Sequence, residues 1–193
     1  MEKRHRIFIA INLPNEIKKG LFLYSEKWPE LPCKWTAKDN LHITLEFLGD
    51  LTDVEIGDVC KIVKEISQRH DSFSINLNKI VYGPLRLRSG QAPRMVWVEG
   101  GKSEELADLK NDLQEYLLEK ISYKPDPIKA FHPHITLARI KEWEFRHFEL
   151  DERPDVNEDI DLIFTVESIE VMESELKRGG PVYTILESHN LGD

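Results

Sequence analysis

The tetrapeptide His-Ile-Thr-Leu occupies His42–Leu45 and occurs again at His134–Leu137, 92 positions later in a chain of 193 residues. The chain has only seven histidines, and a short motif found once would carry little weight. Two identical copies, separated by about half the chain, indicate an internal duplication. Each half of the chain then supplies one histidine to a shared site.

The segments around the two copies follow one order of elements: a strand, a helix, a loop, and a strand that carries the tetrapeptide. Residues 6–13 and 94–99 are rich in β-branched and aromatic residues, which favour strands. Apolar residues at helical spacing follow each of these strands. The predicted elements are, in order, 6–13, 14–28, 31–40 and 41–48 in the first half, and 94–99, 103–117, 122–131 and 134–140 in the second.

The remaining segments complete the predicted set of elements. Thr52 and Glu55 form a capping box at the start of a second helix. A strand is predicted over Phe73–Val81, followed by a basic loop over 84–93. Residues 141–157 are acidic and irregular, with at most a short helix. The last two predicted strands are Asp161–Met172 and Pro181–Leu186, separated by a turn at Gly179-Gly180.

These elements predict an α+β fold in two pseudo-symmetric lobes. Each lobe is an antiparallel sheet with helices packed on its outer face, and the groove between the lobes holds the active site. We expect a single bilobal domain over residues 1–193, with duplicated halves at about 1–83 and 94–187 that are free to exchange strands.

The alternation of side chains along a strand predicts which residues of the motif face the groove. Side chains two positions apart share one face of a strand, so His42 and Thr44 face the groove while the intervening Ile43 is buried. His134 and Thr136 repeat this arrangement. If the lobes are related by a pseudo-two-fold axis, both histidine–threonine pairs face the same groove.

Such a groove suits a phosphodiester. The hydroxyls of Thr44 and Thr136 would donate hydrogen bonds to phosphate oxygens, and the imidazoles of His42 and His134 would act as acid and base. An unperturbed histidine has a pKa of about 6.5, so both protonation states are accessible near pH 7. General acid or base catalysis by each histidine would raise the reaction rate by about 10²- to 10⁴-fold. A single histidine on a half-buried strand is more often structural, but two matched copies favour catalysis.

A metal site is the main chemical alternative, since two histidines could be combined with Glu46 or Asp50. Threonine is a poor ligand for transition ions, and no cluster of ligands repeats with the histidines. Cys33 and Cys60 lack the spacing of a zinc site. We therefore predict no metal and no cofactor.

Composition limits the remaining possibilities. A formal net charge of −9 argues against broad, non-specific binding of nucleic acid, although it allows a locally basic cleft. No apolar run reaches the roughly 18–20 residues of a membrane helix, and no cleavable leader is expected. With only two cysteines, a cytoplasmic monomer with no obligatory protein partner is the default expectation.

The motifs resemble those of the two-histidine (2H) phosphoesterase superfamily, and within it the RNA 2′,3′-cyclic phosphodiesterase family, formerly described as 2′-5′ RNA ligases. The resemblance covers nearly the whole chain, and no motif position departs from it. The segments that carry it are Arg6–Pro14, Trp35–Gly49, Pro93–Val98, Phe131–Arg139 and Ser174–Leu186.

The resemblance implies metal-independent hydrolysis of a terminal 2′,3′-cyclic phosphate on RNA to a 2′-phosphomonoester, with weak reverse 2′-5′ ligation as a side activity. It also implies that His42 donates a proton to the leaving 3′ oxygen and that His134 activates water. The residues alone leave this assignment open, because a pseudo-symmetric site is compatible with either.

Arg94 and Arg139 are secondary candidates for contacts with RNA. Arg139 has the strand parity opposite to His134, so on a regular strand it would point away from the phosphate. It either contacts RNA at the end of the strand or makes a structural ion pair.

The sequence leaves open two alternatives to a phosphodiesterase that acts on RNA ends. The first is a phosphodiesterase for 2′-5′ oligonucleotides or small cyclic nucleotides. The second is a non-catalytic nucleotide-binding module.

Overall fold

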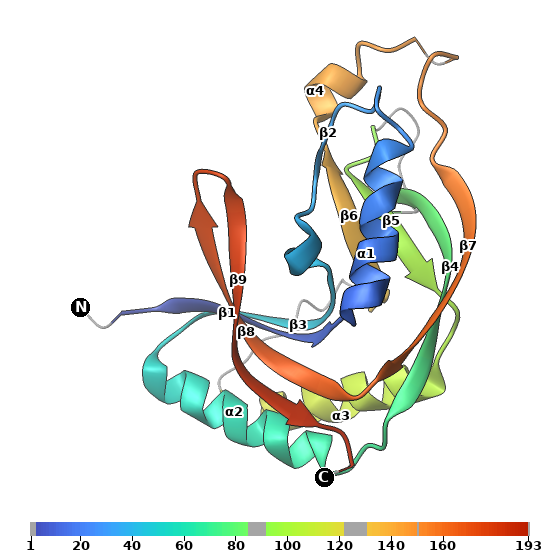
Figure 1. Ribbon diagram of the computed structural model, residues 1–193. Helices are drawn as coiled ribbons and strands as arrows, with labels where there is room; N and C mark the ends of the chain where they lie inside the picture. Colours follow the sequence, from blue (N-terminus) through green and yellow to red (C-terminus); the bar gives the residue numbers. More distant parts are fainter. Residues whose placement is uncertain (1–2, 85–91, 122–130, 150, 193) are drawn as a thin grey trace.

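A computed structural model describes residues 3–84, 92–121, 131–149 and 151–192, and within these ranges nine strands form one curled antiparallel sheet with helices against it (Figure 1). The α+β class predicted from the sequence is confirmed. The strands are β1 His5–Asn12, β2 Cys33–Trp35, β3 His42–Leu51, β4 Phe73–Gly83, β5 Met95–Gly100, β6 His134–Ile140, β7 Asn157–Val166, β8 Ser168–Lys177 and β9 Gly180–Asn190.

The helices lie between these strands in the chain. The α-helices are α1 Asn15–Leu23, α2 Asp53–Ser67, α3 Glu104–Lys120 and α4 Glu142–Phe145, and two short 3-10 helices are η1 Tyr24–Glu26 and η2 Lys38–Asn40. The capping box at the start of α2 is present, with Thr52 and Glu55 bonded to each other in both directions. No helix of the described ranges is long and apolar enough to cross a bilayer.

The sheet has the order β7-β4-β5-β6-β3-β1-β8-β9, with β2 added alongside β6. The two strands that carry the tetrapeptides, β3 and β6, meet at its centre. They are paired at Ile43 and Ile135, the same position of each copy. The two motifs therefore cross at equivalent residues, as a local two-fold relation requires.

The halves of the sheet do not coincide with the halves of the chain. β4 precedes the second tetrapeptide by many residues, yet it pairs with β5 and β7. β8 and β9 come from the end of the chain and lie against β1. Each half of the sheet is thus built from both halves of the sequence.

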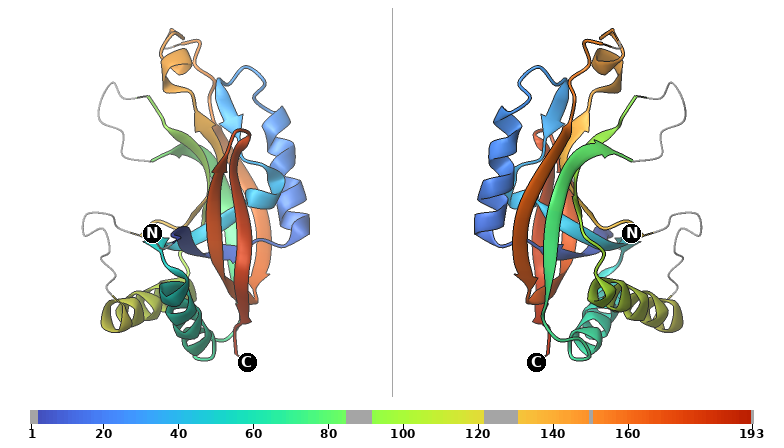
Figure 2. Two further views of the ribbon diagram at one scale, coloured as in Figure 1. Left: turned by 90° about the vertical axis from the view of Figure 1, so that its left-hand side faces the viewer. Right: turned by 90° about the vertical axis from the view of Figure 1, so that its right-hand side faces the viewer.

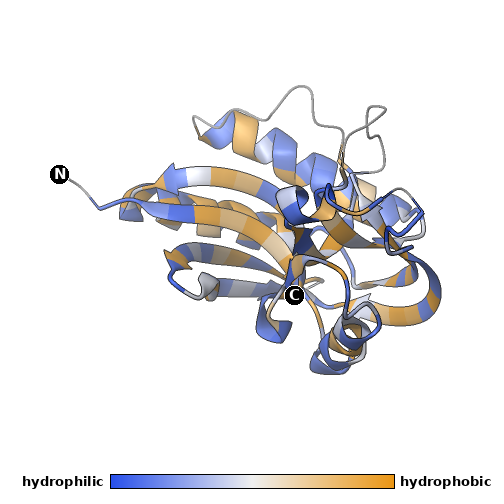
Figure 3. Cartoon of the chain, turned by 90° about the horizontal axis from the view of Figure 1, so that it is seen from above, coloured by the Kyte–Doolittle hydropathy of each residue, from blue (hydrophilic) through white to orange (hydrophobic). Residues whose placement is uncertain are grey.

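The helices pack against the sheet, and α3 also reaches the rim of the cavity described below. Figures 1 and 2 show α1 beside the half of the sheet that contains β4 and β7, with α2 and α3 side by side near the C-terminus. α2 packs on β8 and β9, and α3 packs on α2 and β3. Hydrophobic and hydrophilic residues alternate along the elements (Figure 3), so one face of each strand enters the core.

The strands that carry the two tetrapeptides are fixed by the packing of one face in the hydrophobic core. Ile43, Leu45, Ile135 and Leu137 are each at most 3% exposed and belong to one large apolar cluster. Their burial holds the intervening histidines and threonines on the opposite face, as the alternation predicts.

Two details of the sequence prediction were wrong. The single strand predicted over Asp161–Met172 is interrupted at Glu167. Its two parts lie in opposite halves of the sheet, β7 at one edge and β8 next to β9 at the other. The predicted loop 31–40 contains β2, which is too short to show a periodic pattern and forms because β6 offers it a partner. Residues 85–91 of the basic loop and 122–130 of the second loop lie outside the described residues.

Candidate active site

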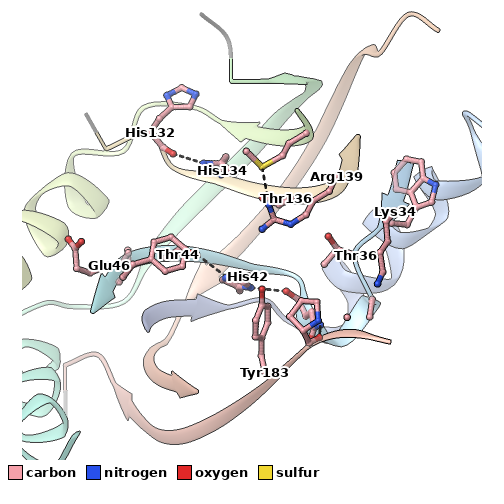
Figure 4. A pocket seen from close by; sticks show the side chains of 18 of the residues that line it. Lys34, Thr36, His42, Thr44, Glu46, His132, His134, Thr136, Arg139 and Tyr183 are labelled. Atoms are coloured by element: carbon pink, nitrogen blue, oxygen red, sulfur yellow. Dashed lines mark hydrogen bonds between the residues drawn. The ribbon is translucent and has the colours of Figure 1, made fainter. Parts of the chain in front are cut away.

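A cavity of about 420 Å³ brings the two tetrapeptides together. His42 and Thr44 from β3 and His134 and Thr136 from β6 all line it (Figure 4). Because β3 and β6 are antiparallel and paired at Ile43 and Ile135, each histidine lies beside the threonine of the other copy. The two imidazoles thus occupy diagonal corners of one site.

Both histidines are oriented by the same local contact. The Nδ1 of His42 lies 2.7 Å from the carbonyl oxygen of Asn40, and the Nδ1 of His134 lies 2.7 Å from that of His132. A carbonyl oxygen only accepts, so Nδ1 carries the proton in each ring and donates it. The Nε2 atoms remain as the nitrogens that take up or release protons.

His42 is enclosed by aromatic side chains. Its ring lies 5.1 Å from that of Phe8 and 5.2 Å from that of Tyr183, measured between centroids. The hydroxyl of Thr44 donates to Nε2 across 2.9 Å when the ring is neutral. Burial lowers the pKa of His42 to about 4, opposed by the bond to the Asn40 carbonyl, while the charges of Lys18 and His134 lower it further. His42 is therefore neutral at pH 7 in the free protein.

Lys18 belongs to the structure that supports His42. This lysine, on α1, is 5% exposed, and its ammonium donates to the carbonyl of Asp39 across 2.9 Å. Asp39 lies in η2, next to the Asn40 carbonyl that holds the imidazole. Lys18 thus links α1 to the turn that orients His42, and its charge disfavours the imidazolium.

His134 has a different neighbour. Its ring stacks on the indole of Trp97, with centroids 3.9 Å apart and an interplanar angle of 26°. Trp97 is the partner of Thr136 on the adjacent strand, whereas Thr44 is paired with the small residue Ala10. The two-fold relation of the strands is therefore broken in the surroundings of the histidines.

Gly83 makes room for Trp97. A Cβ atom at Gly83 would lie 2.2 Å from the indole ring, far inside van der Waals contact. A glycine at the end of β4 is therefore required for the ring that supports His134. The sequence offered no local signal for this contact, because the two residues lie on different strands.

A β-bulge follows each threonine and redirects the chain. Trp97 is paired with Thr136 and its neighbour Val96 with Ala138, which leaves Leu137 without a partner on β5. The first copy has the same irregularity at Leu45. An extra residue reverses the alternation of a strand, so Arg139 lines the cavity instead of pointing away as a regular strand would place it.

Arg94 lies apart from the cavity-lining residues. Its side chain is 69% exposed, and its guanidinium lies 3.4 Å from the carboxylate of Glu142 on α4. Arg139, by contrast, lines the cavity, and its guanidinium lies 4.0 Å from the sulfur of Met95.

The lining of the cavity is cationic although the chain is acidic. Its only lining carboxylate among the described residues is Glu46, and this is ion-paired with Lys110 from α3. Lys34 and Arg139 add two positive charges. Sequence reasoning missed Lys34 and Lys110, because Lys34 reaches the cavity through the pairing of β2 with β6 and Lys110 through the packing of α3 on β3. The part of the chain that the structure describes holds no cluster of three or more metal-ligating side chains.

Comparison with known proteins gives a consistent result. The family described as LigT like Phosphoesterase matches residues 11–92 and 96–183, one segment for each tetrapeptide. The RNA 2′,3′-cyclic phosphodiesterase of Aquifex aeolicus is 33% identical over 168 residues, which cover 82% of this chain and 82% of that protein. The protein of the same name from Thermus thermophilus is 32% identical over 191 residues, 96% of this chain and 90% of the relative.

Solved structures share the whole fold. A crystal structure of a Thermus thermophilus protein superimposes with a TM-score of 0.81 at 29% identity, covering 97% of this chain and 98% of that one. Escherichia coli LigT complexed with 3′-AMP has a TM-score of 0.76 at 26% identity, covering 99% of this chain and 100% of that one.

Proposed function

The chain belongs to the LigT-like phosphoesterase family, and from this membership we propose that it hydrolyses 2′,3′-cyclic phosphate ends of RNA to 2′-phosphomonoesters. The observation that carries the proposal is the shared cavity, in which two imidazoles with their Nδ1 atoms anchored alike flank two threonine hydroxyls. The names of the Aquifex and Thermus relatives support the choice of substrate.

The proposed reaction needs two proton transfers and no other co-reactant than water. His134 accepts a proton from water as its oxygen attacks phosphorus, and His42 donates a proton to the 3′ oxygen as its bond to phosphorus breaks. The hydroxyls of Thr44 and Thr136 stabilise the phosphate oxygens, and Arg139, farther along β6, contacts the RNA at the end of its strand. The products are a 2′-phosphate and a free 3′-hydroxyl. Arg94 does not line the cavity, and we propose it only for a contact with RNA outside it.

The donor role of His42 requires that it gain a proton on binding. Its pKa of about 4 in the free protein on its own favours the role of acceptor. The negative charge of a bound phosphodiester stabilises an adjacent imidazolium and raises its pKa. His42 then takes up its proton together with the substrate.

A substrate with a different leaving group tests this assignment. In a 4-nitrophenyl ester of a nucleoside phosphate, the departing phenolate is stable without a proton. His42→Ala should therefore keep most of the wild-type rate on this ester, while His134→Ala should not. The reverse pattern would assign the donor role to His134.

The same site supports a weak ligation. When a 5′-hydroxyl replaces water as the nucleophile, attack on the cyclic phosphate joins the two ends through a 2′-5′ linkage. We expect this product only at high concentrations of the 5′-hydroxyl end, because water is in large excess.

The working form that we propose is a monomer in the cytoplasm, independent of membranes and of an obligatory protein partner. Both histidines come from one chain, so the site is complete without a second copy. Cys33 and Cys60 are both free thiols, which agrees with a reducing compartment.

An assay with a 2′,3′-cyclic RNA end in the presence of EDTA tests the function directly. Release of a 2′-phosphate is expected with EDTA present. His42→Ala and His134→Ala should each lower kcat by about 10²- to 10⁴-fold without loss of folding. His147→Ala is the matched control, since His147 lies on the surface beyond α4 and bonds only locally, to the Trp143 carbonyl.

Other outcomes would select the alternatives. Tight binding of the RNA end without turnover would favour a nucleotide-binding module. Faster cleavage of 2′-5′ oligonucleotides or small cyclic nucleotides than of RNA ends would favour the second kind of phosphodiesterase. Loss of activity in EDTA would contradict metal independence.

A further inference from the structure

Two cations face each other at one end of the cavity. Lys34 on β2 and Arg139 on β6 are direct cross-strand partners, and both line the cavity. Side chains directly opposite in an antiparallel pair have Cβ atoms about 4.5–5.5 Å apart, where like charges destabilise the pair. A bound anion between them would remove this repulsion.

Neither cation is neutralised by a carboxylate among the described residues. The Lys34 ammonium donates to the Gly179 carbonyl across 2.7 Å, and the Arg139 guanidinium approaches the sulfur of Met95. An ammonium carries three donors and a guanidinium five. One contact each leaves both groups able to bind an anion.

The tip of the β8–β9 hairpin is shaped around the Lys34 ammonium. Gly180 has a φ of +123°, and a Cβ atom there would lie 2.8 Å from the lysine Nζ. The adjoining Pro181 carbonyl accepts a hydrogen bond from the Asn40 side chain across 2.7 Å. The hairpin tip, β2 and η2 together hold this ammonium at the edge of the cavity.

The opposite end of the cavity carries no net charge. Glu46 lies there, ion-paired with Lys110. Phe47 follows Glu46 on β3, and the centre of the Phe131 ring lies 5.7 Å from the Lys110 ammonium, so these two lining residues supply aromatic surface near it. Figure 4 shows Glu46 and Lys34 at opposite ends, with the motif residues between them. An uncharged aromatic end suits a base, whereas a cationic end suits a phosphate.

We propose that Lys34, together with Arg139, holds a second phosphate, the one that links the terminal nucleotide to its 5′ neighbour. This inference rests on the proposed function. Arg139 lies three residues beyond Thr136, roughly 10 Å along the strand, and its long side chain can reach back toward Thr136 to the closer spacing of neighbouring phosphates. The RNA chain then leaves the site past Lys34, with the terminal base toward Glu46 and Phe47.

Binding of two simple ligands tests the subsite without turnover. Adenosine 3′-monophosphate carries only the phosphate for the histidines, and adenosine 3′,5′-bisphosphate carries the second one as well. The wild-type protein should bind the bisphosphate more tightly. Lys34→Gln keeps a donor for the Gly179 carbonyl and removes the charge, and it should reduce this advantage by about 3- to 10-fold while leaving the affinity for the monophosphate unchanged.

Two further variants complete the test. Lys38→Gln removes the same charge from η2, outside the cavity lining, and should leave the advantage intact. Lys34→Glu should abolish the advantage and unfold at an equal or higher temperature, because it replaces a repulsive pair by an attractive one. Equal binding of both ligands by the wild type, or equal weakening of both by Lys34→Gln, would overturn the inference. Failure of turnover on cyclic ends would instead overturn the proposed function.

Discussion

His42 shows how the orientation of an imidazole can be set by its own strand. The carbonyl two residues earlier fixes the proton on Nδ1, and the threonine two residues later lies at Nε2. Both neighbours are set by the local sequence, so the orientation of the ring is encoded in five consecutive residues. The pKa of the ring is lowered mainly by burial, to which the aromatic side chains of other elements contribute, and less by the charge of Lys18.

The neutral state of His42 predicts a pH dependence of stability. Its pKa is about 4 in the folded protein and about 6.5 in an unfolded chain. Between these values the unfolded state binds more protons, so this group's stabilising contribution is complete above about pH 6.5 and is lost as the pH falls toward 4. Replacement of His42 by asparagine should reduce the change in unfolding free energy between pH 4 and pH 6.5 by about 1–3 kcal/mol.

Urea unfolding of both proteins at intervals between pH 4 and pH 7 provides the measurement. All other titrating groups are shared, so the difference between the two curves isolates position 42. Asparagine retains a donor for the Asn40 carbonyl, which keeps the local geometry. Identical pH dependence in the two proteins would mean that His42 is not held neutral by the fold.

At the scale of elements, strand irregularities decide which side chains reach the site. The bulges at Leu45 and Leu137 occur at the same place in each copy. They turn Phe47 and Arg139 into the cavity at opposite ends. A duplicated backbone thus presents an aromatic ring at one end and a cation at the other, which gives a pseudo-symmetric site a direction.

The contact between β4 and β5 predicts a sensitive glycine. Gly83→Ala would push the Trp97 ring off its place beneath His134, since the added Cβ atom has no space. We expect a loss of about 1–3 kcal/mol in unfolding free energy from overpacking and a fall in kcat, because the imidazole loses its support.

Gly57→Ala is the control for this substitution. Gly57 lies inside α2 with nothing within 4 Å of an added Cβ atom. Alanine there should raise the unfolding free energy by about 0.5–1 kcal/mol, because alanine favours helices, and leave kcat unchanged. The measurements are the thermal unfolding and the kcat of both variants. A Gly83→Ala protein with wild-type values would show that Trp97 can move without consequence.

At the scale of the whole molecule, the sheet joins segments that are distant in the chain. β4 completes the half of the sheet that holds His134, and β8 with β9 completes the half that holds His42. Neither half of the sequence contains a full set of neighbouring strands. The cavity forms only where the two composite halves meet, at Ile43 and Ile135.

This exchange predicts the behaviour of a divided chain. Two fragments cut between residues 84 and 92 should each fail to unfold cooperatively when alone, because each leaves strand edges and apolar faces unpaired. Mixed in equal amounts, they should recover circular dichroism and part of the phosphodiesterase activity. Cooperative folding of either fragment by itself would show that the halves are independent units.

The sequence by itself determined the duplication, the strands that carry it and the face on which both histidines and both threonines lie. These features depend on the alternation of neighbouring residues, and neighbours in the chain remain neighbours on a strand. It also predicted the capping box of α2, which is formed by residues three positions apart.

The tertiary structure alone decided the rest. Four features depend on residues far apart in the chain. They are the separation of β7 from β8 in the sheet, the direction of the Arg139 side chain after its bulge, the positions of Lys34 and Lys110 in the cavity lining, and the lowered pKa of His42. Strand pairing, burial and electrostatic fields act through space, so no local pattern of residues can encode them.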